Sequence, residues 1–242
     1  MFASSSASQV RASKSRASIA GTALVAAGSL VAGAVFAYKV PPLTLLTMFR
    51  ERLPEPGSAE EQAFKAKIEH ELQQSPVLAK YRADPNFAER RMWFGTPEQY
   101  RKHAFLSGAL DGAGKFAVPG IVFTNEKDNR VVSVIHVGSQ LAGFPTIVHG
   151  GLIASLLDES LARAAILPLP SRTAVTANLD INYKLPTFVN QVVSIETYVT
   201  ENTDRKSLVA GTVKNKSGVV VAEATGVFVV PKKFKLQSLE NM

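Results

Sequence analysis

Residues 149–166 read HGGLIASLLDESLARAAI, and this stretch decides the fold of the C-terminal half of the chain. Its apolar side chains recur at spacings of three and four residues, which predicts a helix that ends before Pro168. Because few polar residues interrupt the repeat, we expect the helix to be buried on most of its faces. Such a helix needs other elements of the chain to cover it.

Strand patterns lie on both sides of this helix. Residues 117–124 and 131–137 are apolar and β-branched, and a turn at 126–129 joins them. Four strands are expected after the helix, at Thr173–Tyr183, Val192–Thr200, Ser207–Lys214 and Val219–Val229, with hairpin turns at 202–205 and 215–218. The sequence therefore predicts an α+β domain over residues 116–235, a curved antiparallel sheet wrapped around a central helix.

Two features of the helix point to chemistry. His149, Gly150 and Gly151 stand at its N-terminus, where backbone N–H groups lack intrahelical partners and can stabilise an oxyanion. Asp158 lies among apolar residues, and a buried carboxylate costs several kcal/mol unless hydrogen bonds compensate it, which indicates a role. Glu159 is turned by about 100° around the helix and is expected to face elsewhere. In the purely structural alternatives, the glycines only ease a tight turn and Asp158 is a hydrogen-bonded core acid.

A resemblance to a known family rests on this helix and on one strand. An HGG sequence at the start of a buried helix, an acid nine residues after the histidine and a following meander resemble the hotdog thioesterases of the PaaI type. The strand TANLDINYKLP, residues 176–186, resembles that of the mitochondrial acyl-CoA thioesterases called thioesterase superfamily members four and five. The resemblance covers residues 116–231.

The resemblance implies hydrolysis of acyl-CoA thioesters to free fatty acid and CoA, without a cofactor. Asp158 is then the general base or nucleophile, and Thr176 helps to place the water. The backbone amides of His149, Gly150 and Gly151 are the oxyanion donors. A homodimer or a dimer of dimers is also implied, in which the glycine of one subunit faces the aspartate of the other. The CoA phosphates need nearby cations, for which the candidates are Arg163, Arg172, Lys184, Arg205 and Lys206.

Several other functions lack the residues that they need. The chain has no cysteine, no GxSxG sequence and no P-loop, which argues against a thiolate enzyme, a serine hydrolase and an NTPase. Its four histidines are scattered without nearby acidic spacing, so no metal site is expected. The alternatives are a non-catalytic acyl-CoA-binding or membrane-anchored scaffold protein and, less favoured, a hotdog dehydratase, whose paired Asp and His are not visible.

The N-terminal segment carries most of the net charge of +7. Residues 1–50 contain five basic residues and no acidic residue, whereas the rest of the chain is nearly neutral, so nucleic-acid binding is not indicated. Residues 1–18 are rich in Ser and Ala, which predicts a mitochondrial targeting segment. Residues 19–37 are uncharged and about 28 Å long as a helix, which predicts a membrane anchor, most simply in the inner membrane. An uncleaved signal anchor of the secretory pathway is the alternative.

Between the anchor and the sheet, two regions are distinguished by composition. Residues 38–57 contain four prolines and are expected to form a linker. Residues 58–115 are expected to form a helical cover, which begins with a capping box made by Ser58 and Glu61. Seven aromatic side chains among many charges at 77–116 suggest a lid on the substrate side of the domain.

Overall fold

The computed structural model describes residues 29–30, 33–35, 38 and 52–232. The chain divides into two compact units, residues 1–50 and 51–242. The described residues of the first unit are helical. Within the described parts of the chain, no helix is both long and apolar enough to cross a membrane. The predicted targeting segment at 1–18 lies outside the described residues, as do most of the predicted anchor at 19–37 and most of the linker at 38–57.

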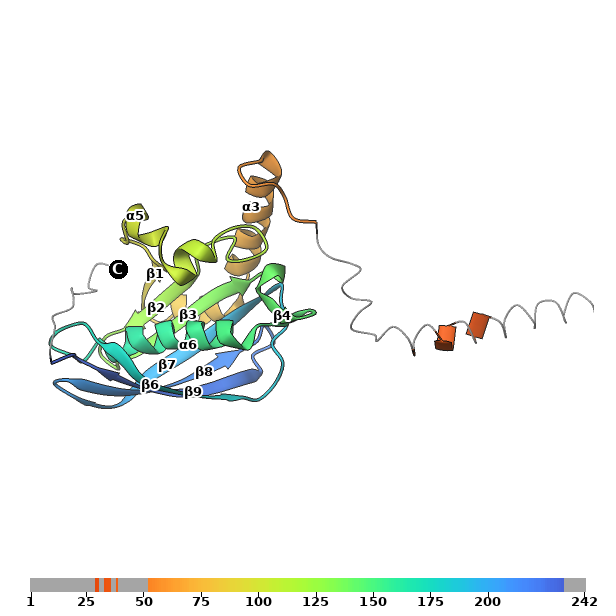
Figure 1. Cartoon of the computed structure of the whole chain (residues 1–242). Helices are drawn as coiled ribbons and strands as arrows, with labels where there is room; N and C mark the ends of the chain where they lie inside the picture. The colour runs from red at the N-terminus through yellow and green to blue at the C-terminus, as the bar shows by residue number, and fades with distance from the viewer. Residues whose placement is uncertain (1–28, 31–32, 36–37, 39–51, 233–242) are drawn as a thin grey trace, which may run out of the picture. The chain divides into compact units, whose positions relative to one another are not determined.

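The second unit is built on a seven-stranded antiparallel sheet with the strand order β1-β2-β3-β7-β8-β9-β6. Its strands are β1 (Ala88–Arg91), β2 (Ile121–Asn125), β3 (Arg130–Val137), β6 (Val175–Tyr183), β7 (Gln191–Thr203), β8 (Lys206–Lys214) and β9 (Val220–Val229). The helix α6 (Gly150–Ala165) lies along the sheet, as Figure 1 shows. The predicted fold, an antiparallel hotdog sheet around a central helix, is confirmed.

The packing of α6 combines apolar contacts with a few buried hydrogen bonds. Leucine and isoleucine side chains from the helix enter the main core together with residues of β3, β7, β8 and β9. Ser160 is fully buried, and its hydroxyl donates to Ser133 Oγ at 3.0 Å. The Ser207 hydroxyl donates to the carbonyl of Ala165 at 2.8 Å. These bonds satisfy buried polar groups and fix the position of the helix against the sheet.

A glycine on β8 allows the sheet to approach the helix closely. A Cβ atom at Gly211 would lie 2.8 Å from Thr197 Cγ2 and 3.1 Å from Leu161 Cδ2. We therefore expect Gly211→Ala to lower the free energy of unfolding by about 1–3 kcal/mol through overpacking, as measured by chemical denaturation. Gly150→Ala is the matched control, because its Cβ atom would meet nothing nearer than 3.7 Å. Equal denaturation midpoints for the two variants would contradict this account of the packing.

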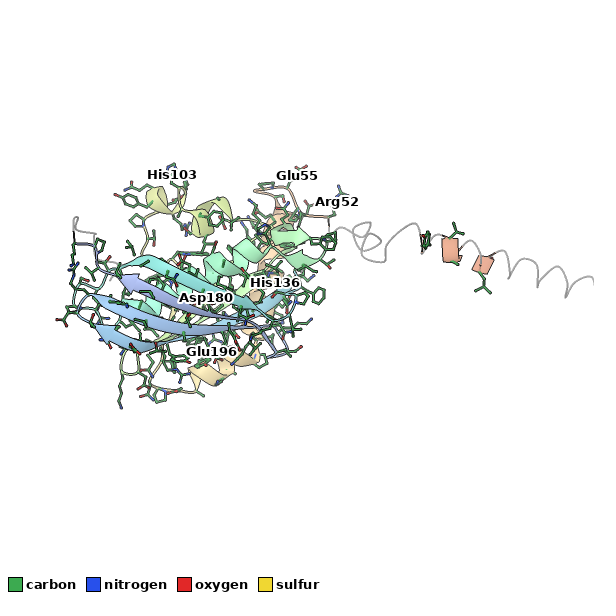
Figure 2. All side chains as sticks on the ribbon, turned by 60° about the horizontal axis from the view of Figure 1, so that its bottom comes forward. Arg52, Glu55, His103, His136, Asp180 and Glu196 are labelled. Atoms are coloured by element: carbon green, nitrogen blue, oxygen red, sulfur yellow. The ribbon has the colours of Figure 1, made fainter. Side chains whose placement is uncertain are left out.

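Two helices cover the opposite face of the sheet. The predicted helix at the start of the cover region is α3 (Ala59–Gln73), and α4 (Pro76–Arg82) follows it. The Glu61 N–H donates to Ser58 Oγ at 3.1 Å, and the Gly57 N–H donates to Glu61 Oε2 at 2.7 Å, so the cap forms with its return bond one residue earlier than expected. Figure 2 shows these helices against the face that carries Glu196. Burial and then the charge of Glu196 raise the pKa of Tyr81, on α4, to about 12.

The rest of the predicted cover region is not purely helical. It contributes strand β1, which pairs with β2 at the edge of the sheet, followed by α5 (Glu98–Arg101) and the π-helix η1 (Phe105–Ala109). The sequence of β1, AERR, has no alternation of apolar and polar residues that would predict a strand. It is a strand because it pairs with β2 at the edge of the sheet. Strand β2 begins at Ile121, later than expected, since Pro119 cannot donate to a strand ladder. A short hairpin of β4 (Ala142–Phe144) and β5 (Ile147–Val148) precedes α6.

Candidate active site

Asp158 lies on the wall of a cavity of about 680 Å³ between α6 and the segment around α5 and η1. Its side chain is half-buried, and its Oδ1 atom accepts a hydrogen bond of 2.7 Å from the hydroxyl of Thr176. Ala154 and Ala162, one helical turn before and after Asp158, also line the cavity. The small side chains leave space on both sides of the carboxylate, so a ligand can reach it.

A β-bulge in β6 brings Thr176 to this carboxylate. In the pairing of β6 with β9, Thr176 lies opposite Phe228 and Asn178 lies opposite Val227, so Ala177 is an extra residue. The extra residue reverses the alternation of side chains. As a result, Thr176 shares the inner face of the strand with Leu179, which lines the cavity, and with Tyr183. Simple alternation along the strand would place Thr176 on the outer face.

The HGG sequence forms a hydrogen-bonded cap at the N-terminus of α6. His149 is the N-cap, and its Nδ1 atom accepts from the Gly151 N–H at 2.9 Å. The Tyr183 hydroxyl donates to the Gly150 carbonyl at 2.8 Å. Among residues 52–232, the Gly150 N–H has no acceptor, whereas the Leu152 N–H donates to the His149 carbonyl at 2.9 Å. Of the amides at this end, the Gly150 N–H is therefore the one that is available to a ligand.

The two predicted halves of the site are far apart within one chain. His149 and Gly151 line a second cavity of about 420 Å³, and Phe105 of η1 contributes to both cavities. Gly150 and Asp158 are eight positions apart on α6, which corresponds to about 12 Å along the helix axis. A single carbonyl group cannot contact both groups of the same chain. The structure thus brings Asp158 together with Thr176, but not with the glycines.

The expectation that Glu159 faces away from the cleft is wrong. Glu159 lines the same cavity as Asp158, because the cavity is wide enough to span two adjacent rows of helix positions. Its Oε1 atom accepts from Trp93 Nε1 at 2.9 Å and from an Arg163 guanidinium nitrogen at 2.6 Å. Trp93, Glu159 and Tyr183 are site residues that sequence reasoning missed. The aromatic-rich composition of 77–116 was the one available signal, and it pointed to a lid without identifying Trp93.

The candidate phosphate-binding cations are spread over the domain. Arg163 lines the Asp158 cavity and is paired with Glu159. Lys184 is paired with Glu223 at 3.0 Å, and Arg205 donates to the Val230 carbonyl at 2.8 Å. Arg172, in the α6–β6 connection, lies 3.3 Å from Glu126 in the β2–β3 turn, and Lys206 is exposed at the start of β8. No group of three or more His, Cys, Asp or Glu side chains that could hold a metal ion occurs in the described residues.

Comparison with known proteins places this site in a family. The sequence profile of the thioesterase superfamily matches residues 146–222, a range that includes Gly150, Asp158 and Thr176. An uncharacterized mitochondrial protein of Candida albicans is 31% identical over 158 residues, which cover 63% of this chain and 71% of that protein. A UPF0644 protein of Schizosaccharomyces pombe is 30% identical over 171 residues, 68% of this chain and 65% of its own length.

The chain is also similar to an enzyme whose name states its activity. The acyl-coenzyme A thioesterase THEM4 of Bos taurus is 28% identical over 158 residues, which cover 65% of this chain and 61% of that enzyme. The chain thus spans slightly less than two thirds of the S. pombe and bovine relatives. The hotdog topology, the profile match over α6 and β6 and these relatives agree, and the chain belongs to the thioesterase superfamily.

Proposed function

We propose that the protein hydrolyses acyl-CoA thioesters to fatty acid and CoA, with Asp158 as general base or nucleophile. The observation that carries this proposal is the Asp158 carboxylate, held by the Thr176 hydroxyl at 2.7 Å on the wall of a large cavity. The name of the bovine relative, an acyl-coenzyme A thioesterase, supports the same chemistry. The wall contains largely apolar and aromatic side chains, which suits an acyl group.

Thioester hydrolysis needs a nucleophile and a group that stabilises the negative carbonyl oxygen. In the base mechanism, Asp158 takes a proton from water as the water attacks the carbonyl carbon, and the C–S bond then breaks to release CoA as its thiol. In the nucleophile mechanism, Asp158 itself attacks the carbonyl carbon, and the C–S bond breaks to release CoA as a thiolate that takes a proton from solvent. Water then hydrolyses the resulting anhydride, which releases the fatty acid and restores the Asp158 carboxylate. In both, the Gly150 N–H at the helix N-terminus donates to the oxyanion.

The active site is proposed to form between two copies of the chain. Gly150 and Asp158 of one chain are about 12 Å apart along α6, so the oxyanion donor must come from the partner. β6 stands at one edge of the sheet, and exposed apolar side chains lie on it and just after it, namely Val175, Tyr183, Leu185 and Phe188. An edge strand with such neighbours favours pairing with a second copy, which gives a homodimer.

An acyl-CoA hydrolysis assay tests the proposed activity. The full chain is incubated with acyl-CoAs from butyryl to stearoyl, and the released thiol is quantified. We expect turnover with at least part of this series. Tight binding of acyl-CoA without release of CoA would instead support the alternative, a non-catalytic acyl-CoA-binding or membrane-anchored scaffold protein.

We also propose that residues 1–18 direct the protein to mitochondria and that residues 19–37 anchor it in the inner membrane. The acid-free basic composition of the first segment and the uncharged run in the second support this proposal, as does the mitochondrial relative of C. albicans. Cell fractionation should recover the protein with mitochondria, and carbonate extraction should leave it in the membrane pellet. Recovery in the soluble cytosolic fraction would contradict both parts, and recovery with secretory membranes would support the signal anchor.

A further inference from the structure

The cavity at Asp158 has a roof that comes from outside the superfamily match. We call residues 93–107 the roof segment. It contributes Trp93, Thr96, Tyr100 and residues 104–107 to the cavity, whereas α6, its C-cap residue Ile166 and β6 contribute the rest. Leu106 is buried, but Tyr100 and Phe105 remain 61% and 59% exposed although they line the cavity. The two aromatic side chains therefore lie at its mouth, where an apolar ligand would cover them.

One hydrogen-bonded link joins the roof segment to the helix beside Asp158. Trp93 Nε1 donates to Glu159 Oε1 at 2.9 Å, and Arg163 donates to the same oxygen at 2.6 Å. The side chains of Glu159 and Arg163 are each only 24% exposed, so solvent screens this ion pair less than it would screen a pair on the open surface.

The backbone conformation of Trp93 indicates that its hydrogen bond to Glu159 positions the roof segment. Its φ angle is 61°, in the left-handed region that a bulky residue seldom adopts. Such a conformation persists where surrounding contacts determine it. The Trp93 ring packs at 6.1 Å from the Phe116 ring, and the indole N–H is held by Glu159. The roof segment is thereby positioned at its first residue.

We propose that this cavity is the acyl-chain site, that the roof segment sets the accepted chain length, and that Trp93 and Glu159 are positioning residues for the roof. This inference rests on the proposed thioesterase function. A site that buries the chain under a fixed roof should gain about fourfold in kcat/KM for each methylene group that it covers. The gain should stop where the cavity ends.

Three variants test the inference in the full chain. Ala162→Leu fills the cavity one turn from Asp158, so the longest acyl-CoAs should lose the most kcat/KM and the shortest the least. Trp93→Phe keeps an aromatic ring but removes the N–H donor, and Glu159→Ala removes the acceptor. Both should flatten the dependence of kcat/KM on chain length, mainly by raising KM for long chains. Glu159→Gln should restore the wild-type profile, because its side-chain oxygen still accepts from Trp93.

Phe94→Ala is the matched control, since Phe94 adjoins Trp93, is 73% exposed and does not line this cavity. Its chain-length profile should equal that of the wild type. An equal loss at every chain length in the three test variants would overturn the inference and leave a structural role only. If the wild type hydrolyses nothing, the proposed function fails. The role of the roof segment in setting the accepted chain length is then tested separately, by calorimetric Kd values for non-hydrolysable S-alkyl-CoA ethers. An affinity that does not depend on the length of the alkyl chain would overturn the inference about the roof segment.

Discussion

Asp158→Asn should lower kcat by about 10²–10⁴-fold or more while acyl-CoA binding persists. Asn has nearly the same shape as Asp, so the register of α6 and the packing of the cavity should be preserved. In the wild type, the Thr176 hydroxyl donates to Asp158 Oδ1 at 2.7 Å, and the amide oxygen of Asn can still accept this hydrogen bond. What is lost is the negative charge that activates water or attacks the thioester. The measurement is kcat together with the Kd for a non-hydrolysable acyl-CoA analogue.

Two further substitutions show whether the loss belongs to the carboxylate alone. Thr176→Val keeps the β-branched shape and removes the hydroxyl, so its kcat should lie between those of the wild type and Asp158→Asn. Glu159→Gln should be much milder, because the hydrogen bonds from Trp93 and Arg163 need only an oxygen acceptor. The assignment of Asp158 is wrong if Asp158→Asn retains near wild-type kcat while Glu159→Gln loses it.

Gly150→Pro should lower kcat by about 10²–10³-fold, the usual effect of removing one oxyanion donor. Gly150 is the first residue of α6, a position where proline is well tolerated because its missing N–H has no intrahelical partner. The preceding residue, His149, already has φ −59° and ψ 129°, which suits a residue before proline. Gly150→Ala keeps the N–H and has room for its methyl group, so it should retain most of the activity.

The two inactive variants, Asp158→Asn and Gly150→Pro, should complement each other when they are co-expressed. In a mixed dimer with shared sites, one site receives an intact Gly150 from one chain and an intact Asp158 from the other. Random pairing of two chains should then restore about one quarter of wild-type activity. Sedimentation should show dimers for all preparations. A mixture as inactive as its two components would rule out a site shared between subunits.

The sequence predicts most of this fold because its strands and main helix follow local periodicity. The repeat at 149–166 locates α6 within one residue of its observed ends, and the strands that follow it begin and end within three residues of their predicted positions. Hairpin turns are encoded by residues that lie next to one another. Strand β1 was missed because its four residues become a strand only through pairing with β2, some thirty residues away.

The site was predictable only where its chemistry is concentrated in one element. Asp158 stands out as a carboxylate on an apolar helix, and HGG stands out at the start of that helix. The contact between Trp93 and Glu159 joins residues that are 66 positions apart, and no local pattern encodes it. The hydrogen bond from Tyr183 to the Gly150 carbonyl likewise depends on how β6 lies along α6.

The extra residue in β6 also has a consequence for how this strand can change length during evolution. Because Ala177 has no partner of its own on β9, its deletion would leave Thr176 and Tyr183 on the same side of the strand. Deletion of Asp180 would instead turn Tyr183 away from the side of Thr176 if the bulge is kept, or Leu179 away from it if the bulge is lost. A relative that is one residue shorter at this point can therefore keep the same contacts to Asp158 and Gly150. Gaps in alignments of this strand should collect at the bulge, positions 177 and 178, and be absent from positions 180–182.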